Sequence, residues 1–323
     1  MADRHVLAIV PEHIGGRAVG ARLTPAFEGL ADVAIVERAD EDPAALAHAT
    51  VIITGLAPIT GQHLAAAAAL ELVQCASHGF DYVDLEAARA RGVKVANIGS
   101  TGAEKQNVAE QTFTLMLTLA KQVIPAHLAL RDGEWALPRL QRSITELSEK
   151  TLGLVGFGQI AREVAHRAAA FGMTTIYTDR RRASPEVERA SRVRFAELDD
   201  LLREADYISL HAPLTEETQH LLDARRLALL KPTAFLVNTA RGALVDQKAL
   251  ADALEAGTLA GAGIDVFDPE PPPAALRLLR APNVVLSPHV AGVTRETLMR
   301  IAQAAVINVM RYLATGELHD VVS

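Results

Sequence analysis

The chain contains a single cysteine, Cys75, so no disulfide can form within it. This is consistent with a reducing compartment, and the position of Cys75 in the apolar run 72–76 predicts a small buried side chain. Aromatic residues make up only 4% of the chain, although half of its residues are hydrophobic. The core must therefore be built mainly from Ala, Leu and Val, as in parallel sheets covered by helices.

The chain also lacks an excess of basic residues and any long uncharged apolar run. Its formal net charge is −7, so no global positive field would attract nucleic acid. No uncharged apolar stretch reaches the length of a membrane span. Residues 1–5 lead directly into the strand-like run 6–10 without the pattern of a signal peptide. We therefore expect a cytoplasmic protein with no membrane partner and no nucleic-acid partner.

Short apolar runs alternate with helical segments along most of the chain, which predicts parallel strands joined by right-handed crossovers. Longer helices are expected over 104–130 and 294–315, an irregular connection over 134–149, and a helix capped by Asp246 and ended by Gly257. The expected strands are 6–10, 33–36, 51–53, 72–75, 93–96, 152–156, 174–178, 207–210, 234–237, 260–266 and 284–286.

A glycine-rich turn follows the strand-like run 152–156. Residues 156–161 read G-x-G-x-x-A, with Gly156 suited to a tight turn and Gly158 to close approach by a pyrophosphate at a helix N-terminus. Taken alone the motif is weak, because a glycine turn in an α/β protein can bind nothing. An acid, Asp179, ends the next strand 18 residues after Ala161, close to the spacing of a ribose ligand. The combination predicts a dinucleotide site.

Three stretches in the last third of the chain place chemically active residues at the ends of predicted strands. They are 238–242, 265–271 and 287–292, and they contain Arg241, Glu270 and His289. Ligands of open parallel sheets bind outside the carboxyl ends of the strands, so these side chains are expected in one crevice. A fixed cation and a titratable imidazole oriented by a carboxylate can bind a carboxylate substrate and move a proton.

Taken together, these motifs resemble those of the D-2-hydroxyacid dehydrogenases, and the resemblance extends over nearly the whole chain. The stretches that carry it are 108–110, 131–135, 156–161, 211–215, 238–243, 265–271 and 287–289. The resemblance implies an α/β fold of two doubly wound parallel-sheet domains. A Rossmann cofactor domain, residues 102–291, is inserted into a flavodoxin-like substrate domain, residues 1–101 plus 292–323. It also implies a homodimer formed through the cofactor domains.

The resemblance also implies roles for individual residues. Arg241 would bind the substrate carboxylate, His289 would be the acid–base group, and Glu270 would orient His289. The backbone N–H groups of the loop Ser77, His78 and Gly79 would hold the substrate carboxylate, and Asp265 would position the nicotinamide carboxamide. No metal is implied. The residues expected at the cofactor are Gly156, Gly158, Gln159, Ile160, Asp179, Arg180, Ala212, Pro213, Thr239, Ala240, Arg241, Asp265, His289 and Gly292.

Cofactor and substrate choice are less constrained by these residues. Asp179 favours NAD, because it would bind both ribose hydroxyls and repel a 2′-phosphate, whereas Arg180 and Arg181 leave NADP open. Phosphoglycerate-handling members of the family typically carry arginines in the stretches corresponding to 53–58 and 74–76, where this chain has no cation. We therefore expect a small unphosphorylated 2-oxo acid such as glyoxylate or hydroxypyruvate. The alternatives are a short-form phosphoglycerate dehydrogenase and an NAD-sensing regulator.

One stretch departs from the family pattern. Residues 97–110, which connect the first predicted lobe to the second, are about two residues longer than the usual spacing. Roles within this connection therefore cannot be transferred by resemblance. His78, in the preceding loop, is interpreted as a polar loop residue or as a contact to substrate.

Overall fold

The computed structural model describes residues 4–322. The chain divides into two compact units. Unit 1 consists of Met1–Glu104 with Arg295–Ser323, and unit 2 of Lys105–Thr294. Each unit is built on its own all-parallel sheet, as the alternating sequence pattern predicts.

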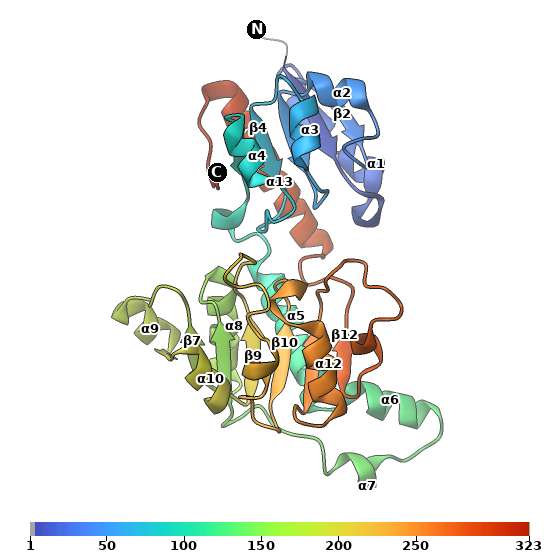
Figure 1. The fold of residues 1–323 in the computed structure, drawn as a ribbon, viewed down its shortest axis with the longest axis vertical. Helices are drawn as coiled ribbons and strands as arrows, with labels where there is room; N and C mark the ends of the chain where they lie inside the picture. The colour runs from blue at the N-terminus through green and yellow to red at the C-terminus, as the bar shows by residue number, and fades with distance from the viewer. Residues whose placement is uncertain (1–3, 323) are drawn as a thin grey trace. The chain divides into compact units, whose positions relative to one another are not determined.

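Unit 1 contains a five-stranded sheet in the order β2-β1-β3-β4-β5 (Figure 1). In this flavodoxin-like order the chain reverses direction across the sheet between β1 and β3. The strands are β1 (His5–Ile9), β2 (Asp32–Val36), β3 (Val51–Thr54), β4 (Leu72–Cys75) and β5 (Lys94–Ala96). The helices are α1 (Gly16–Gly20), α2 (Pro43–His48), α3 (Gly61–Ala66), α4 (Leu85–Ala90) and α13 (Arg295–Thr315), with 3-10 turns at Glu12–Ile14, Thr24–Phe27 and Gly99–Thr101.

Both faces of the unit 1 sheet are covered by apolar side chains. One face packs in a cluster with α2, α3 and α4, and this cluster includes Cys75, which is fully buried as predicted. Burial raises the pKa of the Cys75 thiol to about 12, so it remains protonated and inert. The other face packs against α13 and Phe27. The C-terminal helix therefore completes the core begun by the first hundred residues.

Unit 2 contains a seven-stranded parallel sheet in the order β12-β11-β10-β9-β6-β7-β8. The strands are β6 (Thr151–Val155), β7 (Thr174–Thr178), β8 (Val193–Phe195), β9 (Tyr207–Leu210), β10 (Phe235–Asn238), β11 (Gly261–Ile264) and β12 (Val284–Leu286). The helices are α5 (Lys105–Ala120), α6 (Val123–Arg131), α7 (Leu137–Leu140), α8 (Gln159–Ala170), α9 (Pro185–Ser191), α10 (Leu198–Glu204), α11 (Ala224–Leu227) and α12 (Gln247–Glu255), with 3-10 turns at Gly242–Leu244 and Arg277–Arg280. The strand order reverses between β6 and β9, as in a Rossmann sheet.

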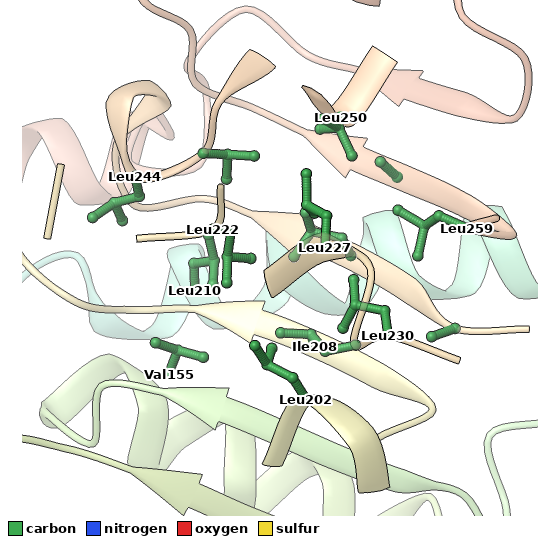
Figure 2. Close-up of a cluster of buried hydrophobic side chains, with 14 of the residues drawn as sticks. Val155, Leu202, Ile208, Leu210, Leu222, Leu227, Leu230, Leu244, Leu250 and Leu259 are labelled. Atoms are coloured by element: carbon green, nitrogen blue, oxygen red, sulfur yellow. The ribbon is translucent and has the colours of Figure 1, made fainter. Parts of the chain in front are cut away.

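The unit 2 sheet is also covered on both faces. Helices α5 and α8 pack on one face, and α10, α11 and α12 on the other. Figure 2 shows Leu202 of α10 and Leu227 of α11 in the same cluster as Ile208 and Leu210 of β9, with Leu250 of α12 farther along the cluster. Alternation of side chains along each strand supplies both cores from the same short segments. The predicted doubly wound architecture is therefore confirmed.

The prediction of one helix over 104–130 was wrong. The structure has two helices, α5 and α6, related by a bend of 58°. Gln122 between them adopts a left-handed conformation with φ 51°, which interrupts the helical hydrogen bonds. Pro125 then lies in the first turn of α6, where a missing N–H costs nothing. The connection 134–149 was expected to be irregular but contains the short helix α7.

Other local predictions agree with the structure. Asp246 caps α12, with its carboxylate accepting hydrogen bonds from the N–H groups of Lys248 and Ala249 at 3.0 Å each. Gly257, with φ 67°, ends the same segment. The edge strand β8 escaped prediction because its three residues are too few to show a period. Within residues 4–322, no single helix has the length and apolarity needed to cross a membrane, and only the bent pair α5 and α6 together meets that criterion.

One close approach determines how the loops after β10 and β11 meet. A Cβ atom added to Gly242 would lie 2.1 Å from the carbonyl carbon of Phe267. No side chain can be accommodated at that distance, and the obstructing atom belongs to the backbone. Only glycine therefore allows the segment that carries Arg241 to lie directly against the segment that leads to Glu270.

We predict that Gly242→Ala destabilises the protein by about 2 kcal/mol or more, because the added methyl group forces two backbone segments apart. Gly158→Ala is the matched control, since its added Cβ would meet no atom within 4 Å. Urea unfolding followed by circular dichroism measures both changes. Equal midpoints for the two variants would contradict the requirement for close contact at Gly242.

Candidate functional site

The predicted cofactor residues follow the carboxyl ends of strands of unit 2, and those after β6 and β9 lie where the strand order reverses. Gly156 follows β6 directly and adopts φ 92°. A Cβ at this position would lie 2.7 Å from the backbone N of Ala212 and the carbonyl carbon of His211. The glycine therefore lets the turn after β6 contact the turn after β9, which contains Ala212 and Pro213.

Gly158 is the N-cap residue of α8, and no side chain caps the helix there. A Cβ built on Gly158 would have no protein atom within 4 Å, so no side chain or backbone segment fills the space beside it at the helix N-terminus. The following Gln159 and Ile160 form the first turn of α8. The N–H groups at a helix N-terminus point toward a ligand there, and together with the helix dipole they favour a phosphate. The local geometry fits a dinucleotide pyrophosphate.

Asp179 lies just after β7, and its carboxylate holds the glycine-rich turn. One oxygen accepts a hydrogen bond from the N–H of Phe157 at 2.7 Å, and the other accepts one from the N–H of Arg181 at 3.2 Å. The ring of Phe157 stacks on Tyr177 of β7 with centroids 4.2 Å apart. The residue expected to bind ribose therefore also fixes the turn expected to face the pyrophosphate.

The basic run after Asp179 is divided between two environments. Arg182 forms two hydrogen bonds to Glu188, at 2.8 and 3.0 Å, and its guanidinium lies over the ring of Phe195. Hydrogen bonds from Arg182 and from Tyr177 lower the pKa of Glu188. Arg180 and Arg181 are exposed. Only these two arginines of the run are therefore available to a ligand near Asp179.

His289 and Glu270 form the predicted pair. The Nδ1 atom of His289 lies 2.7 Å from Oε2 of Glu270, and the other oxygen of Glu270 accepts the N–H of Phe267 at 2.9 Å. Burial opposes ionisation of Glu270, but the hydrogen bonds from His289 and Phe267 and the positive charges of His289 and Arg241 outweigh it and lower its pKa. An ionised Glu270 accepts a hydrogen bond from the Nδ1–H group of His289, which leaves Nε2 of the ring for another partner.

Arg241 lies in the turn after β10, and its backbone is fixed by Asn238. The side-chain amide of Asn238 donates to the carbonyl of Arg241 at 2.8 Å and accepts the N–H of Ala240 at 3.0 Å. The guanidinium of Arg241 donates to the carbonyl of Ala240 at 2.8 Å. The neighbouring Thr239 is buried, with its hydroxyl 3.1 Å from that of Thr112 on α5. A cation is thus held on a rigid turn close enough to favour ionisation of Glu270.

Asp265 is fully buried at the end of β11 and holds the loop that carries His289. Its carboxylate accepts hydrogen bonds from the hydroxyl of Ser287 at 2.5 Å and from the N–H groups of Val290 and Ala291 at 3.0 and 2.9 Å. Its carbonyl accepts the N–H of His289 at 2.7 Å. Asp265 was expected only to contact nicotinamide, and the structure adds this role in positioning His289. Gly292, another predicted cofactor residue, follows Ala291 at the end of this loop.

Some residues that shape the site were not singled out from the sequence. Asn238 and Ser287 lie inside the quoted motifs, so their positions beside Arg241 and His289 were the available signal. Gln111 donates to the hydroxyl of Ser287 at 3.0 Å from helix α5, and nothing in its local sequence indicates that contact. His211 is bonded to Ser209 at 2.9 Å, and burial lowers its pKa to about 3, so it stays neutral.

The predicted carboxylate loop belongs to unit 1, where it follows β4. The hydroxyl of Ser77 donates to the carbonyl of Gly79 at 2.7 Å and lies 2.7 Å from the hydroxyl of Tyr82. The side chain of His78 is exposed. The loop is thus a tight, internally bonded turn.

Comparison with known proteins agrees with this geometry. The sequence model described as "D-isomer specific 2-hydroxyacid dehydrogenase, NAD binding domain" matches residues 113–291. The chain is 40% identical over 258 residues to a glyoxylate reductase of Korarchaeum cryptofilum, covering 79% of this chain and 76% of that protein. It is 38% identical over 265 residues to a hydroxypyruvate reductase of Thermotoga maritima, covering 81% and 84%.

Solved structures show the same fold along the whole chain. A glyoxylate reductase from Paecilomyes thermophila superposes with a TM-score of 0.87 at 29% identity and covers 100% of this chain and 99% of that one. A D-lactate dehydrogenase from Aquifex aeolicus, complexed with NAD and lactic acid, gives a TM-score of 0.86 at 28% identity, covering 99% of each chain. The chain therefore belongs to the D-isomer specific 2-hydroxyacid dehydrogenase family and is an NAD-linked oxidoreductase.

Proposed function

We propose that this protein reduces a small unphosphorylated 2-oxo acid, of the size of glyoxylate or hydroxypyruvate, to the corresponding 2-hydroxy acid. The observation that carries the proposal is the His289–Glu270 pair, 2.7 Å apart, with the charge of Arg241 acting on the same carboxylate. In addition to a hydride source, the reduction of a 2-oxo acid requires a proton donor for the carbonyl oxygen and a cation to bind the carboxylate. The bound dinucleotide supplies the hydride.

In this proposal, His289 transfers the proton, and Glu270 orients the imidazole ring of His289. With Nδ1 bonded to Glu270, the protonated ring presents Nε2–H, which donates to the carbonyl oxygen as negative charge develops on it. The lowered pKa of Glu270 keeps its carboxylate ionised at neutral pH, so it can accept the hydrogen bond from Nδ1. In the oxidising direction, a neutral His289 accepts the same proton. Arg241 binds the substrate carboxylate through its planar guanidinium.

The proposed substrate class rests on charge and on the relatives. The backbone N–H groups of the loop 77–79 are proposed to bind the single carboxylate. The stretches 53–58 and 74–76 contain no cation for a phosphate. Relatives at 38–40% identity are a glyoxylate reductase and a hydroxypyruvate reductase. These observations favour a small unphosphorylated acid over phosphoglycerate, and the complete Arg241–Glu270–His289 set favours turnover over a purely regulatory role.

We further propose that the protein is a homodimer joined through α6, α7 and the segment after them. Large apolar side chains gather along this part of unit 2 with much of their surface exposed. They are Val123, Ile124, Leu128, Leu130, Trp135, Leu137 and Ile144, with Trp135 73% exposed. Exposed large apolar side chains concentrated in one segment indicate an interaction surface. A second copy is the proposed partner because the resemblance implies pairing of cofactor domains.

The central test is turnover. We expect NADH oxidation, followed by absorbance, with glyoxylate or hydroxypyruvate, and no reduction of NAD with 3-phosphoglycerate. His289→Gln should lower kcat by about 10²–10⁴, because general acid catalysis is worth that much. His166→Gln, on the exposed side of α8, is the matched control and should leave kcat unchanged. A kcat for His289→Gln within about tenfold of wild type would remove His289 from the proton transfer.

Cofactor preference should follow the charge of Asp179. We expect kcat/KM to favour NADH over NADPH in the wild type, because an ionised Asp179 repels a 2′-phosphate. Asp179→Asn keeps an oxygen that can accept the hydrogen bond from the Phe157 N–H but removes the charge. It should therefore lower the ratio of kcat/KM for NADH to kcat/KM for NADPH by about tenfold or more. Initial rates with both cofactors measure the ratio. A wild-type preference for NADPH would contradict the role given to Asp179.

The oligomer has its own test. Leu130→Glu places a charge on the exposed apolar surface of α6 and should convert a dimer to a monomer in sedimentation velocity. Met299→Glu, on α13 of unit 1, is the control, since Met299 is exposed to a similar degree, 63% against 61%. Circular dichroism checks that both variants fold. A wild-type monomer, or a dimer unaffected by Leu130→Glu, would show that this surface serves another purpose.

A further inference from the structure

The backbone N–H of His78 already has a carboxylate partner within the chain. It donates a hydrogen bond to Oε1 of Glu104 at 3.1 Å, and both residues belong to unit 1. Under the proposed function, this N–H is among those that hold the substrate carboxylate. A side-chain carboxylate of the protein therefore occupies a donor that the substrate needs.

Both backbone polar groups of His78 are hydrogen-bonded to one segment of the chain. Asn97 donates from its side-chain amide to the carbonyl of His78 at 2.7 Å, while Glu104 accepts from its N–H. The same Asn97 accepts the N–H of Gly99 at 3.0 Å, which shapes the turn between the two contacts. The stretch 97–104 therefore wraps around the loop that is proposed to bind substrate.

The position of Glu104 is also fixed from its own side. Gly102 adopts φ 60°, and the carbonyl of Ala103 accepts a hydrogen bond from Nε of Arg300 at 3.1 Å. The same guanidinium donates to the hydroxyl of Thr297 at 2.9 Å, so Arg300 is anchored on α13. The backbone beside Glu104 is thus tied to a long helix, and only the side chain of Glu104 is left to rotate.

The charge of Glu104 has no cationic partner among the described residues of unit 1. Within residues 4–104 and 295–322, its carboxylate makes the hydrogen bond to His78 and no ion pair with any lysine, arginine or histidine. The side chain is half-buried. A carboxylate without a cationic partner is weakly held, so another anion can displace it from the N–H. It also repels any anion that approaches the same donor.

We propose that Glu104 is a specificity-determining residue that competes with the substrate carboxylate for the N–H of His78, and this inference rests on the proposed function. One N–H cannot serve two carboxylates, so substrate binding requires the side chain of Glu104 to rotate away. The competition raises the KM for every 2-oxo acid, and the added repulsion disfavours acids that carry a second negative charge. The enzyme is thereby directed toward monoanionic substrates.

Glu104 lies in the connection that follows the 3-10 turn Gly99–Thr101. The competing group is supplied by an extended turn and not by a strand end. Substitution of its side chain therefore leaves the core of unit 1 intact.

The test compares KM values in variants of Glu104. Glu104→Gln retains an oxygen for the His78 N–H but removes the charge, and Glu104→Ala removes both. We expect each to lower the KM for glyoxylate about tenfold, equivalent to roughly 1.4 kcal/mol, with kcat and the KM for NADH unchanged. Glu86→Gln, on the exposed side of α4, is the matched control. A KM unchanged in both Glu104 variants would overturn the competition.

Two further readouts separate charge competition from a structural effect. The ratio of wild-type to Glu104→Gln KM should shrink at high salt, because the repulsion is screened over about 10 Å already at 0.1 M. The gain in kcat/KM should also be larger for the dianion oxaloacetate than for glyoxylate. An equal gain for both acids, independent of salt, would overturn the role of the charge.

The inference can fail separately from the proposed function. If the wild-type protein turns over glyoxylate and the Glu104 variants have the same KM for it, only the role of Glu104 is refuted. Wild type that turns over no 2-oxo acid would refute the proposed function. Oxalate binding to the NADH complex, measured by calorimetry, then still decides the competition, since Glu104→Gln should bind oxalate more tightly and equal affinity would overturn it.

Discussion

The site depends on the buried carboxylate of Asp265. A carboxyl group with no exposed surface is costly to bury unless it is hydrogen-bonded, and here a hydroxyl and two backbone N–H groups donate to it. All three donors belong to residues 287–291, so the cost of leaving them unpaired holds the loop in one conformation. His289 lies within that loop, with φ 53°, which places its ring against Glu270. The orientation of the imidazole is therefore a consequence of the burial of a different residue.

The same principle operates at the glycine-rich turn. Asp179 binds the N–H of Phe157, and Phe157 stacks on Tyr177, so the turn is fixed both by a hydrogen bond and by a ring contact. Gly156 and Gly242 permit close backbone approaches that no other residue would allow. Acids of unit 2 therefore serve the fold through their hydrogen bonds, and glycines serve it through their absent side chains.

Unit 1 shows a different use of a carboxylate. Glu104 bonds to a single N–H and has no cationic partner among the described residues of unit 1, whereas Asp265 is buried and accepts three hydrogen bonds. The difference in bonding predicts a difference in behaviour, because a saturated buried acid cannot move without large cost and a singly bonded one can. A chain can thus contain acids that define a conformation and acids that exchange with a ligand.

Local rules predicted much of this protein. The alternation of apolar runs located eleven of the strands within a few residues, and the Asp246 cap and Gly257 stop are local effects that require no tertiary context. The break at Gln122 was missed because both flanking helices share one apolar pattern. The short strand β8 gains its order from pairing with β7, which a three-residue segment cannot indicate.

The sequence alone determined which residue types end neighbouring strands, and hence that Arg241, Glu270 and His289 should converge, because parallel strands align their carboxyl ends. Only the tertiary structure decided how those residues are held. The contacts of Asp265 with residues 287–291, of Gln111 with Ser287, and of Glu104 with His78 join residues 22 to 176 positions apart in the sequence. Such hydrogen bonds have no period or motif, since they arise from where packed backbones leave a polar group unsatisfied.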